Sequence, residues 1–219
     1  MKTDAEISKQ VIDEFQFDPI LRDREIGVSV KDGVATLTGK VDSYYEKRLA
    51  EKVVERVPGI KAIANELEVR LPFENERSDT DIAHAAISAL KWNILVPEDK
   101  IKVKVENGWV TLEGETTWNF EKDEAEQTVA SLTGVKGVIN LIEIRSSVSS
   151  TKVKEKVEEA IKHRAELDAK NIEVSTEGSK IILRGKVSSY IERVEAERAA
   201  WSIAGVTDVE DELDIDVAA

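Results

Sequence analysis

The stretch "KDGVATLTGKVDSYYE" at residues 31–46 recurs as "ENGWVTLEGETTWNFE" at 106–121 and as "EGSKIILRGKVSSYIE" at 177–192. Gly39, Gly114 and Gly185, which lie at matching positions in the three passages, are separated by 75 and 71 residues. Equivalent residues before and after these passages keep the same intervals, and the additional residues of the first interval lie in "LPFENERSDT" at 71–80. The chain is therefore a threefold repeat with a unit of about 70 residues.

Each copy begins with a predicted helix that leads into a predicted hairpin. Ile7, Val11 and Phe15 are four residues apart and so share one face of a helix. The two strands that follow alternate apolar and polar residues. Asp32-Gly33 and Asn107-Gly108 are strong hairpin signals, because both residues of such a turn take positive φ. In the third copy, Glu177-Gly178-Ser179 suggests a turn that is shifted by one residue.

A second helix and a last strand complete each copy. Ser43 with Glu46 and Ser189 with Glu192 have the spacing of capping boxes, whereas the middle copy has Trp118 in place of the serine. Glycine at the end of each of these helices, at positions 59, 134 and 205, fits the residue that terminates a helix.

The fold class expected from this order is α+β, with three tandem α-β-β-α-β domains at 1–72, 73–147 and 148–219. The second helix forms a crossover, so the last strand should run parallel to the strand before that helix. Both helices should cover one face of a three-stranded mixed sheet. We expect repeats to pack on one another or on a partner, because the other face and an edge remain free.

Composition limits the possible functions. The 219 residues carry a net charge of −13, which argues against a general nucleic-acid binder, and they include no cysteine. No apolar run approaches the roughly 18–20 residues of a membrane span. The start "MKTDAEISKQVIDEF" lacks the apolar region of a secretory signal. The sequence as written thus predicts a cytoplasmic protein, and a mature or trimmed periplasmic form would look the same.

The three copies resemble the BON domain of bacterial osmotic-stress and nodulation proteins. The resemblance is carried by "VATLTGKVDSYYEKRLAEKVVERVPGIKAIANELEV" (34–69), "WVTLEGETTWNFEKDEAEQTVASLTGVKGVINLIEI" (109–144) and "KIILRGKVSSYIERVEAERAAWSIAGVTDVEDELDI" (180–215). It implies a non-enzymatic module, without catalytic residues, that binds phospholipid surfaces or other envelope components. Many members of the family are periplasmic or secreted, and one small cytoplasmic relative pairs the domain with potassium binding.

Aromatic residues are concentrated in the middle copy and at the starts of the second helices. They form the candidate interaction patch Trp92, Trp109, Trp118, Phe120, Tyr44, Tyr45 and Tyr190. Two interpretations stay open, namely packing between neighbouring repeats and a contact surface for lipid headgroups or a protein. The repeated glycines are interpreted as structural: Gly33, Gly39, Gly59, Gly108, Gly114, Gly134, Gly178, Gly185 and Gly205.

No catalytic, cofactor-binding or metal-ligating residue is assigned. His84 and His163 are the only histidines and belong to different repeats. Phosphate-binding loops, dinucleotide fingerprints, GxSxG and HExxH are absent, so no enzyme is predicted. The acidic "VEDELDID" at 209–216 lacks the glycine and final glutamate of a calcium loop and is interpreted as an edge strand.

The function predicted from these features is binding and scaffolding in osmotic or envelope stress, through contact with a phospholipid surface or a protein. A sensor for a small ligand or a monovalent ion and a purely structural oligomer are the alternatives. The net charges of −2 for residues 1–72, −6 for 73–147 and −5 for 148–219 indicate that one domain, rather than all three, makes any membrane contact.

Overall fold

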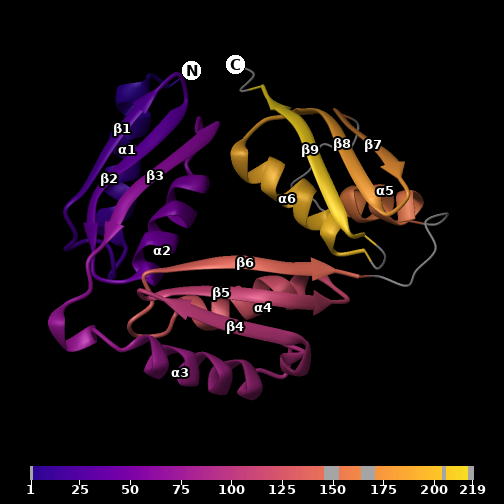
Figure 1. Cartoon of the computed structure of the whole chain (residues 1–219). Coiled ribbons are helices and arrows are strands. Elements are labelled where there is room, and N and C mark those ends of the chain that lie inside the picture. The colour runs from indigo at the N-terminus through magenta and orange to yellow at the C-terminus, as the bar shows by residue number, and fades with distance from the viewer. Residues whose placement is uncertain (1, 146–152, 164–170, 204–205, 217–219) are drawn as a thin grey trace. The chain divides into compact units, whose positions relative to one another are not determined.

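The computed structural model describes residues 2–145, 153–163, 171–203 and 206–216. These residues form three repeated units, each with two α-helices and one three-stranded mixed sheet (Figure 1). The predicted α+β class and the order α-β-β-α-β are thus confirmed. The residue boundaries proposed for the three domains remain a prediction.

The elements follow the repeat closely. The first unit consists of α1 (Asp4–Phe17), β1 (Ile26–Lys31), β2 (Val34–Val41), α2 (Tyr44–Glu55) and β3 (Ala62–Val69). The second consists of the 3-10 helix η1 (Phe73–Asn75), α3 (Asp79–Trp92), the 3-10 helix η2 (Glu98–Lys100), β4 (Ile101–Glu106), β5 (Trp109–Thr116), α4 (Asn119–Ala130) and β6 (Gly137–Ile144). The third consists of α5 (Val153–His163), β7 (Ile172–Glu177), β8 (Lys180–Val187), α6 (Tyr190–Trp201) and β9 (Asp208–Ile215).

In every sheet the second strand of the unit in sequence order is the central one, and the orders are β1-β2-β3, β4-β5-β6 and β7-β8-β9. In the first sheet β1 and β2 are antiparallel, and β3 is parallel to β2, with Val34 opposite Ala62. The third sheet repeats this register, with Lys180 opposite Asp208. The predicted crossover through the second helix is therefore confirmed, and the acidic strand β9 lies at a sheet edge.

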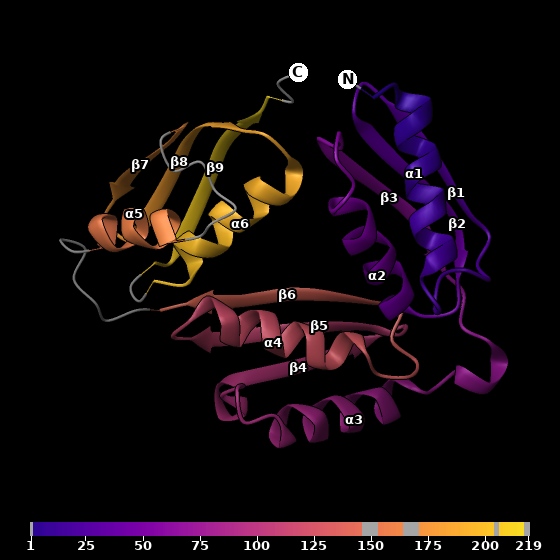
Figure 2. The same cartoon turned by 180° about the vertical axis from the view of Figure 1, so that it is seen from behind.

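Both helices of a unit cover the same face of its sheet, as the view from behind shows for α1 and α2 (Figure 2). The first core combines Ile7, Val11 and Phe15 of α1 with Ala50 and Val54 of α2 and with Ala35, Leu37 and Val41 of β2. Equivalent residues form the third core, among them Val153, Val157 and Ile161 of α5. The apolar periodicity of the sequence therefore identified the buried helix faces correctly.

The hairpin turns agree with the sequence in two units and differ in the third. Asp32 and Asn107 have φ of 52° and 54°, and the glycines after them also have positive φ. In the third unit Glu177 pairs with Lys180, as Lys31 pairs with Val34, so its turn is not shifted. Gly178 takes φ of 65° as the first of its two turn residues, which explains how the same loop length is kept without an Asn-Gly pair.

The glycine after the second helix has another role than the one predicted. Helix α2 ends at Glu55, and its C-cap Arg56 is in the right-handed region, so Gly59 lies beyond the position that terminates the helix. Gly59 has φ of 102°, and a Cβ atom there would come within 2.6 Å of Ile7 of α1. The absence of a side chain at Gly59 therefore leaves room for Ile7 of α1 to pack in the core. Gly205 lies outside the described residues.

A carboxylate at the start of the first helix holds the hairpin turn. The side chain of Asp4 accepts hydrogen bonds from the backbone N–H groups of Asp32 (2.8 Å) and Gly33 (3.4 Å). Asp79 does the same for Asn107 (2.8 Å) and Gly108 (2.9 Å). The two turns are therefore fixed to the helices that precede them.

A polar residue on the apolar face of the last strand links that strand to the second helix. Asn65 donates to the carbonyl oxygen of Lys47 (3.2 Å) and accepts from the N–H of Leu67 (3.3 Å). Asn140 makes the same contacts in the middle unit. In the third unit Asp211 occupies this position and pairs with Arg193 of α6. The sequence signal for this link was a polar residue at the same strand position in all three copies.

Candidate functional site

The aromatic residues proposed as one patch lie on several elements. Trp92 ends α3, Trp109 begins β5, and Trp118 and Phe120 lie at the start of α4. Tyr44 and Tyr45 begin α2, and Tyr190 begins α6. Among the described residues, the ring contact that the structure gives is between Trp118 and Phe120, with centroids 6.2 Å apart. The predicted patch thus draws on residues of all three units, and its role as one interaction surface stays a prediction.

Backbone N–H groups at the start of α4 donate hydrogen bonds to a side chain of the same protein. The backbone N–H groups of Thr117 and Trp118 donate to the carboxylate of Glu121, at 2.8 Å and 3.0 Å. Trp118 itself is half-buried. In α2 and α6 the cap is supplied by Ser43 and Ser189, which accept from the N–H groups of Glu46 and Glu192 as predicted. These helix starts are therefore capped from within and not prepared for an external anion.

Trp109 lies on the face of the middle sheet that is opposite to the buried Val110. Its side chain is 48% exposed, and its ring lies so close to Gly137 that a Cβ atom there would be 2.4 Å from the ring. Ile139 and Leu141 follow Gly137 at alternate positions of β6 and are also exposed. This sheet face therefore carries three accessible apolar side chains, among charged ones such as Lys104 and Glu113.

Strongly exposed apolar side chains of the middle unit lie together at the end of α3. Trp92 is 86% exposed and Ile94 is 97% exposed, and Leu95 beside them is also exposed. We call residues 92–95 the apolar tip. The sequence identified Trp92 but missed Ile94 and Leu95, because periodicity does not distinguish exposed from buried apolar residues after a helix ends.

The first unit has an equivalent tip that the sequence analysis missed. Phe17 and Ile20 precede Trp92 and Leu95 by the repeat interval of 75 residues, and Phe17 is 85% exposed. The sequence signal that could have identified this tip was the position of Phe17, which is equivalent to that of Trp92 in the repeat.

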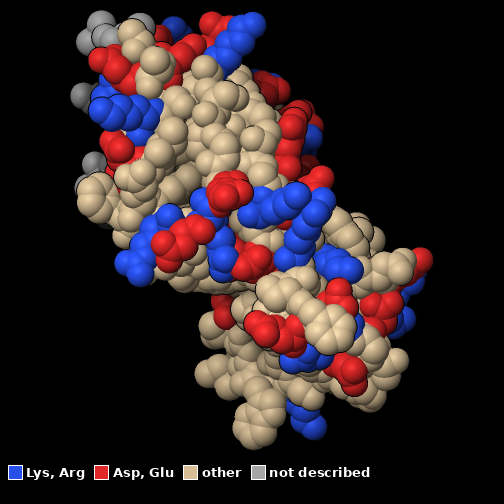
Figure 3. All heavy atoms as spheres, turned by 90° about the vertical axis from the view of Figure 1, so that its left-hand side faces the viewer, with Lys and Arg blue, Asp and Glu red and all other residues tan. Residues whose placement is uncertain are grey.

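The three sheets differ in chemistry on the face that carries no helices. In the first sheet this face is mostly uncharged and small: Gly27, Ser29, Val34, Thr36, Thr38, Ala62 and Ala64. Figure 3 shows a broad uncharged area over the first unit, bordered by charged side chains. The middle sheet has Trp109, Ile139 and Leu141 instead. A partner that fits one of these faces is therefore not expected to fit the others.

The third sheet carries a ladder of ion pairs across β8 and β9. Lys180 pairs with Glu210 at 2.9 Å, Arg184 pairs with Glu212, and Lys186 pairs with Asp216 at 2.9 Å. The hydrogen bond from Arg184 lowers the pKa of Glu212, and the bond to Glu212 raises the pKa of Arg184. The pKa of Lys186 is raised in the same way by Asp216. These pairs are solvent-exposed, so each contributes little to stability.

The described residues contain no group of three or more His, Cys, Asp or Glu side chains that could hold a metal ion. His84 is exposed on α3. In the described part of the chain, no helix is long and apolar enough to span a bilayer.

Comparisons with known proteins agree with the repeat. The family model described as "BON domain" matches residues 3–70, 78–146 and 149–217. The chain is 30% identical over 124 residues to "Osmotically-inducible protein Y" of Escherichia coli strain K12, an alignment that covers 55% of this chain and 62% of that protein. The match therefore spans less than two thirds of the relative.

Two solved structures align over most of the chain at low similarity. One is the C-terminal domain of CdsD, a structural protein of the Type III secretion system of Chlamydia trachomatis, with 14% identity, a TM-score of 0.26, and coverage of 94% of this chain and 97% of that one. The other is the PrgH periplasmic domain, with 11% identity, a TM-score of 0.22, and coverage of 88% and 96%. TM-scores of this size do not establish a shared arrangement.

Proposed function

This chain belongs to the BON domain family, and from that premise we propose that it is a non-enzymatic binding and scaffolding protein of osmotic or envelope stress that contacts a phospholipid surface. The link to osmotic stress is supported by the similarity to an osmotically inducible protein. The contact is assigned to the apolar tip at residues 92–95. The proposal holds in either of the compartments that the sequence leaves open, because it depends on the surface alone.

The observation that carries this proposal is the exposure of Trp92 and Ile94, at 86% and 97%. Tryptophan is favoured at the boundary between lipid headgroups and acyl chains, where its ring is buried and its N–H stays hydrated. A neighbouring aliphatic residue adds apolar area that water would otherwise surround. The net charge of −6 on residues 73–147 opposes adsorption to anionic lipid by charge alone, so apolar insertion has to supply the binding.

Flotation with vesicles of phosphatidylethanolamine and phosphatidylglycerol tests the proposal. We expect binding that persists at about 0.5 M salt, where interactions between exposed charges are largely screened. The double substitution Trp92→Ala with Ile94→Ser should weaken binding at least tenfold, because transfer of two apolar side chains from water is lost. The melting temperature should not change, since both side chains are exposed.

Trp118→Ala is the matched control. It removes a tryptophan of the same unit that is half-buried, so it should lower stability and leave vesicle binding unchanged. Absence of binding by the unaltered protein, or equal binding by the tip variant, would contradict the lipid contact.

A second candidate function is favoured by the exposed face of the middle sheet. Trp109, Ile139 and Leu141 form an apolar surface that suits a protein partner or a second copy of the chain. The mass in solution, measured by sedimentation, distinguishes these cases. A dimer that becomes a monomer on Trp109→Glu would support a structural oligomer.

A further inference from the structure

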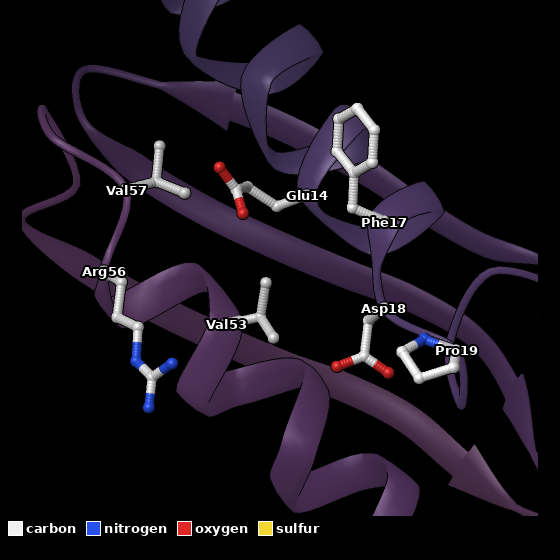
Figure 4. Close-up of a pocket in the computed structure, with 7 residues that line it drawn as sticks. All are labelled: Glu14, Phe17, Asp18, Pro19, Val53, Arg56 and Val57. Carbon is white, nitrogen blue, oxygen red and sulfur yellow. The ribbon is translucent and has the colours of Figure 1, made fainter.

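The first unit contains a pocket of about 260 Å³ between the end of α1 and the end of α2 (Figure 4). Seven residues line it: Glu14, Phe17, Asp18, Pro19, Val53, Arg56 and Val57. Its volume is below the range of about 300–1,000 Å³ that is typical of sites for drug-sized ligands. The pocket therefore suits a small molecule.

The charges around this pocket lie on opposite elements. Glu14 and Asp18 belong to the end of α1, and Arg56 is the C-cap of α2 (Figure 4). Asp18 is already used structurally, because one of its carboxylate oxygens accepts from the N–H groups of Ile20 (2.8 Å) and Leu21 (3.2 Å).

Unlike Asp18, Glu14 and Arg56 have no structural hydrogen bond through their side chains within the described part of the chain. For the described residues, the structure gives no side-chain hydrogen bond or ion pair for either of them. Glu14 of α1 and Arg56 at the end of α2 thus offer two exposed, oppositely charged groups at the pocket, with Val53 between them and Val57 beside Glu14 (Figure 4).

We propose that this pocket binds a small zwitterion, with its cationic group at Glu14 and its anionic group at Arg56. Phe17 lines the same pocket with an exposed aromatic ring, a group that binds ammonium ions by cation–π attraction, in addition to the Glu14 carboxylate. Arginine binds carboxylate or phosphate through two parallel N–H donors, which gives the anionic end a defined orientation. The valines provide an apolar contact for the methylene or methyl groups of the ligand.

The other two units do not repeat these charges. The positions equivalent to Glu14 and Arg56 are Ala89 and Ser131 in the middle unit, and Ala160 and Ser202 in the third. The free charges are therefore not required by the fold, which all three units share. The site is specific to the first unit.

The same pair of charges occurs in free metabolites and in the headgroup of a zwitterionic lipid. The site does not depend on the apolar tip, which lies in the middle unit, so either proposal can fail without the other. Titrations with soluble probes and with vesicles separate the two sources of the ligand.

The experiment is a two-dimensional ¹H–¹⁵N NMR titration of the full chain with glycine betaine and with phosphocholine, which differ in the separation of their charges. Tetramethylammonium and acetate serve as single-charge probes. We expect shifts in residues 14–21 and 53–57, and an affinity for at least one zwitterion that is tenfold or more above the affinity for either single-charge probe. Equal binding of tetramethylammonium would overturn the proposal, since Arg56 would then have no role.

Glu14→Gln and Arg56→Gln should each reduce the affinity at least fivefold without changing the melting temperature. Lys52→Gln is the matched control, because Lys52 is an exposed cation one turn earlier on α2 that does not line the pocket. Unchanged affinity in both pocket variants would overturn the assignment.

A vesicle arm uses pure phosphatidylcholine, tested with the apolar-tip variant so that insertion of residues 92–95 does not contribute. Binding to these vesicles that is lost on Arg56→Gln, without binding of the soluble probes, would assign the site to a lipid headgroup. If neither vesicles nor soluble zwitterions bind, the proposal is wrong.

Discussion

Three equivalent glycines occupy a position at which the backbone of the neighbouring segment leaves no room for a side chain. A Cβ atom at Gly39, Gly114 or Gly185 would lie 2.3 Å, 2.1 Å or 2.0 Å from a carbonyl oxygen. All three also have positive φ, between 122° and 146°. Strain and steric overlap therefore act together at this position.

Gly114→Ala should destabilise the middle unit by about 3 kcal/mol or more, since unfavourable φ alone costs about 1–3 kcal/mol and the overlap with Lys100 adds to it. Urea unfolding followed by tryptophan fluorescence measures this, because three of the four tryptophans belong to that unit. Gly178→Asn is the control, as nothing lies within 4 Å of a Cβ atom there and asparagine tolerates positive φ. A loss of similar size in the control would show that overlap is not the cause.

At the residue scale the sequence predicted which glycines are structural but not always why. Glycine at hairpin turns and within β2 could be identified from spacing and turn chemistry. The role of Gly59 could not, because the reason is contact with Ile7, which lies in another element. Local sequence does not contain that information.

At the scale of elements, the link between the last strand and the second helix is the contact most open to test. Asn140→Ala removes two donated bonds, to Lys122 and Glu126, and one accepted bond, from Ile142. We expect a loss of about 1–3 kcal/mol, because half-buried backbone groups lose their partners. Tryptophan fluorescence during urea unfolding again reports the affected unit.

The third unit supplies the matched control for this substitution. Asn140→Asp together with Lys122→Arg reproduces the pair of Asp211 and Arg193. The double variant should recover most of the lost stability. If it is no better than Asn140→Ala, the contact is not a transferable link between strand and helix.

The ion-pair ladder of the third sheet predicts a pH dependence. The pKa of Glu212 is lowered from its ordinary value of 4.5 by Arg184, so its contribution is present above that value and is lost as pH falls through the folded-state pKa. The melting temperature of Glu212→Gln should therefore lie below that of the unaltered protein at pH 7, and the difference should shrink as the pH falls below 4.5 and through the lowered pKa of Glu212.

Glu25→Gln, at an exposed glutamate of the first unit, provides the comparison, with no such difference expected at either pH. The effect at Glu212 should also diminish with added salt, because the pair is exposed. A difference in melting temperature that grows at low pH would contradict a stabilising pair between Glu212 and Arg184.

At the scale of the whole chain, the threefold repeat made the architecture predictable, whereas the differences between the copies limited the prediction of functional sites. Glycine spacing, hairpin signals and apolar periodicity recur three times, so the order of elements and the helix-covered face of the sheets could be deduced. The exposed Ile94, Ile139 and Leu141 were missed, because an apolar residue at a strand or loop position is ordinarily interpreted as core. The pocket was missed because Glu14 and Arg56 come to line one pocket only when the ends of two helices lie side by side.

The different faces of the sheets also bear on how a chain with three similar units avoids misfolding. Mispairing of strands between neighbours is a characteristic failure of tandem repeats. In the first and third units the parallel strands begin with Val34 opposite Ala62 and with Lys180 opposite Asp208. In the middle unit the ring of Trp109 lies against Gly137. If β9 took the place of β6 during refolding, the ring of Trp109 would meet a carboxylate where it requires a bare backbone. The sequence differences that give each unit its own sheet surface thus also disfavour pairing of a strand with a strand of another unit.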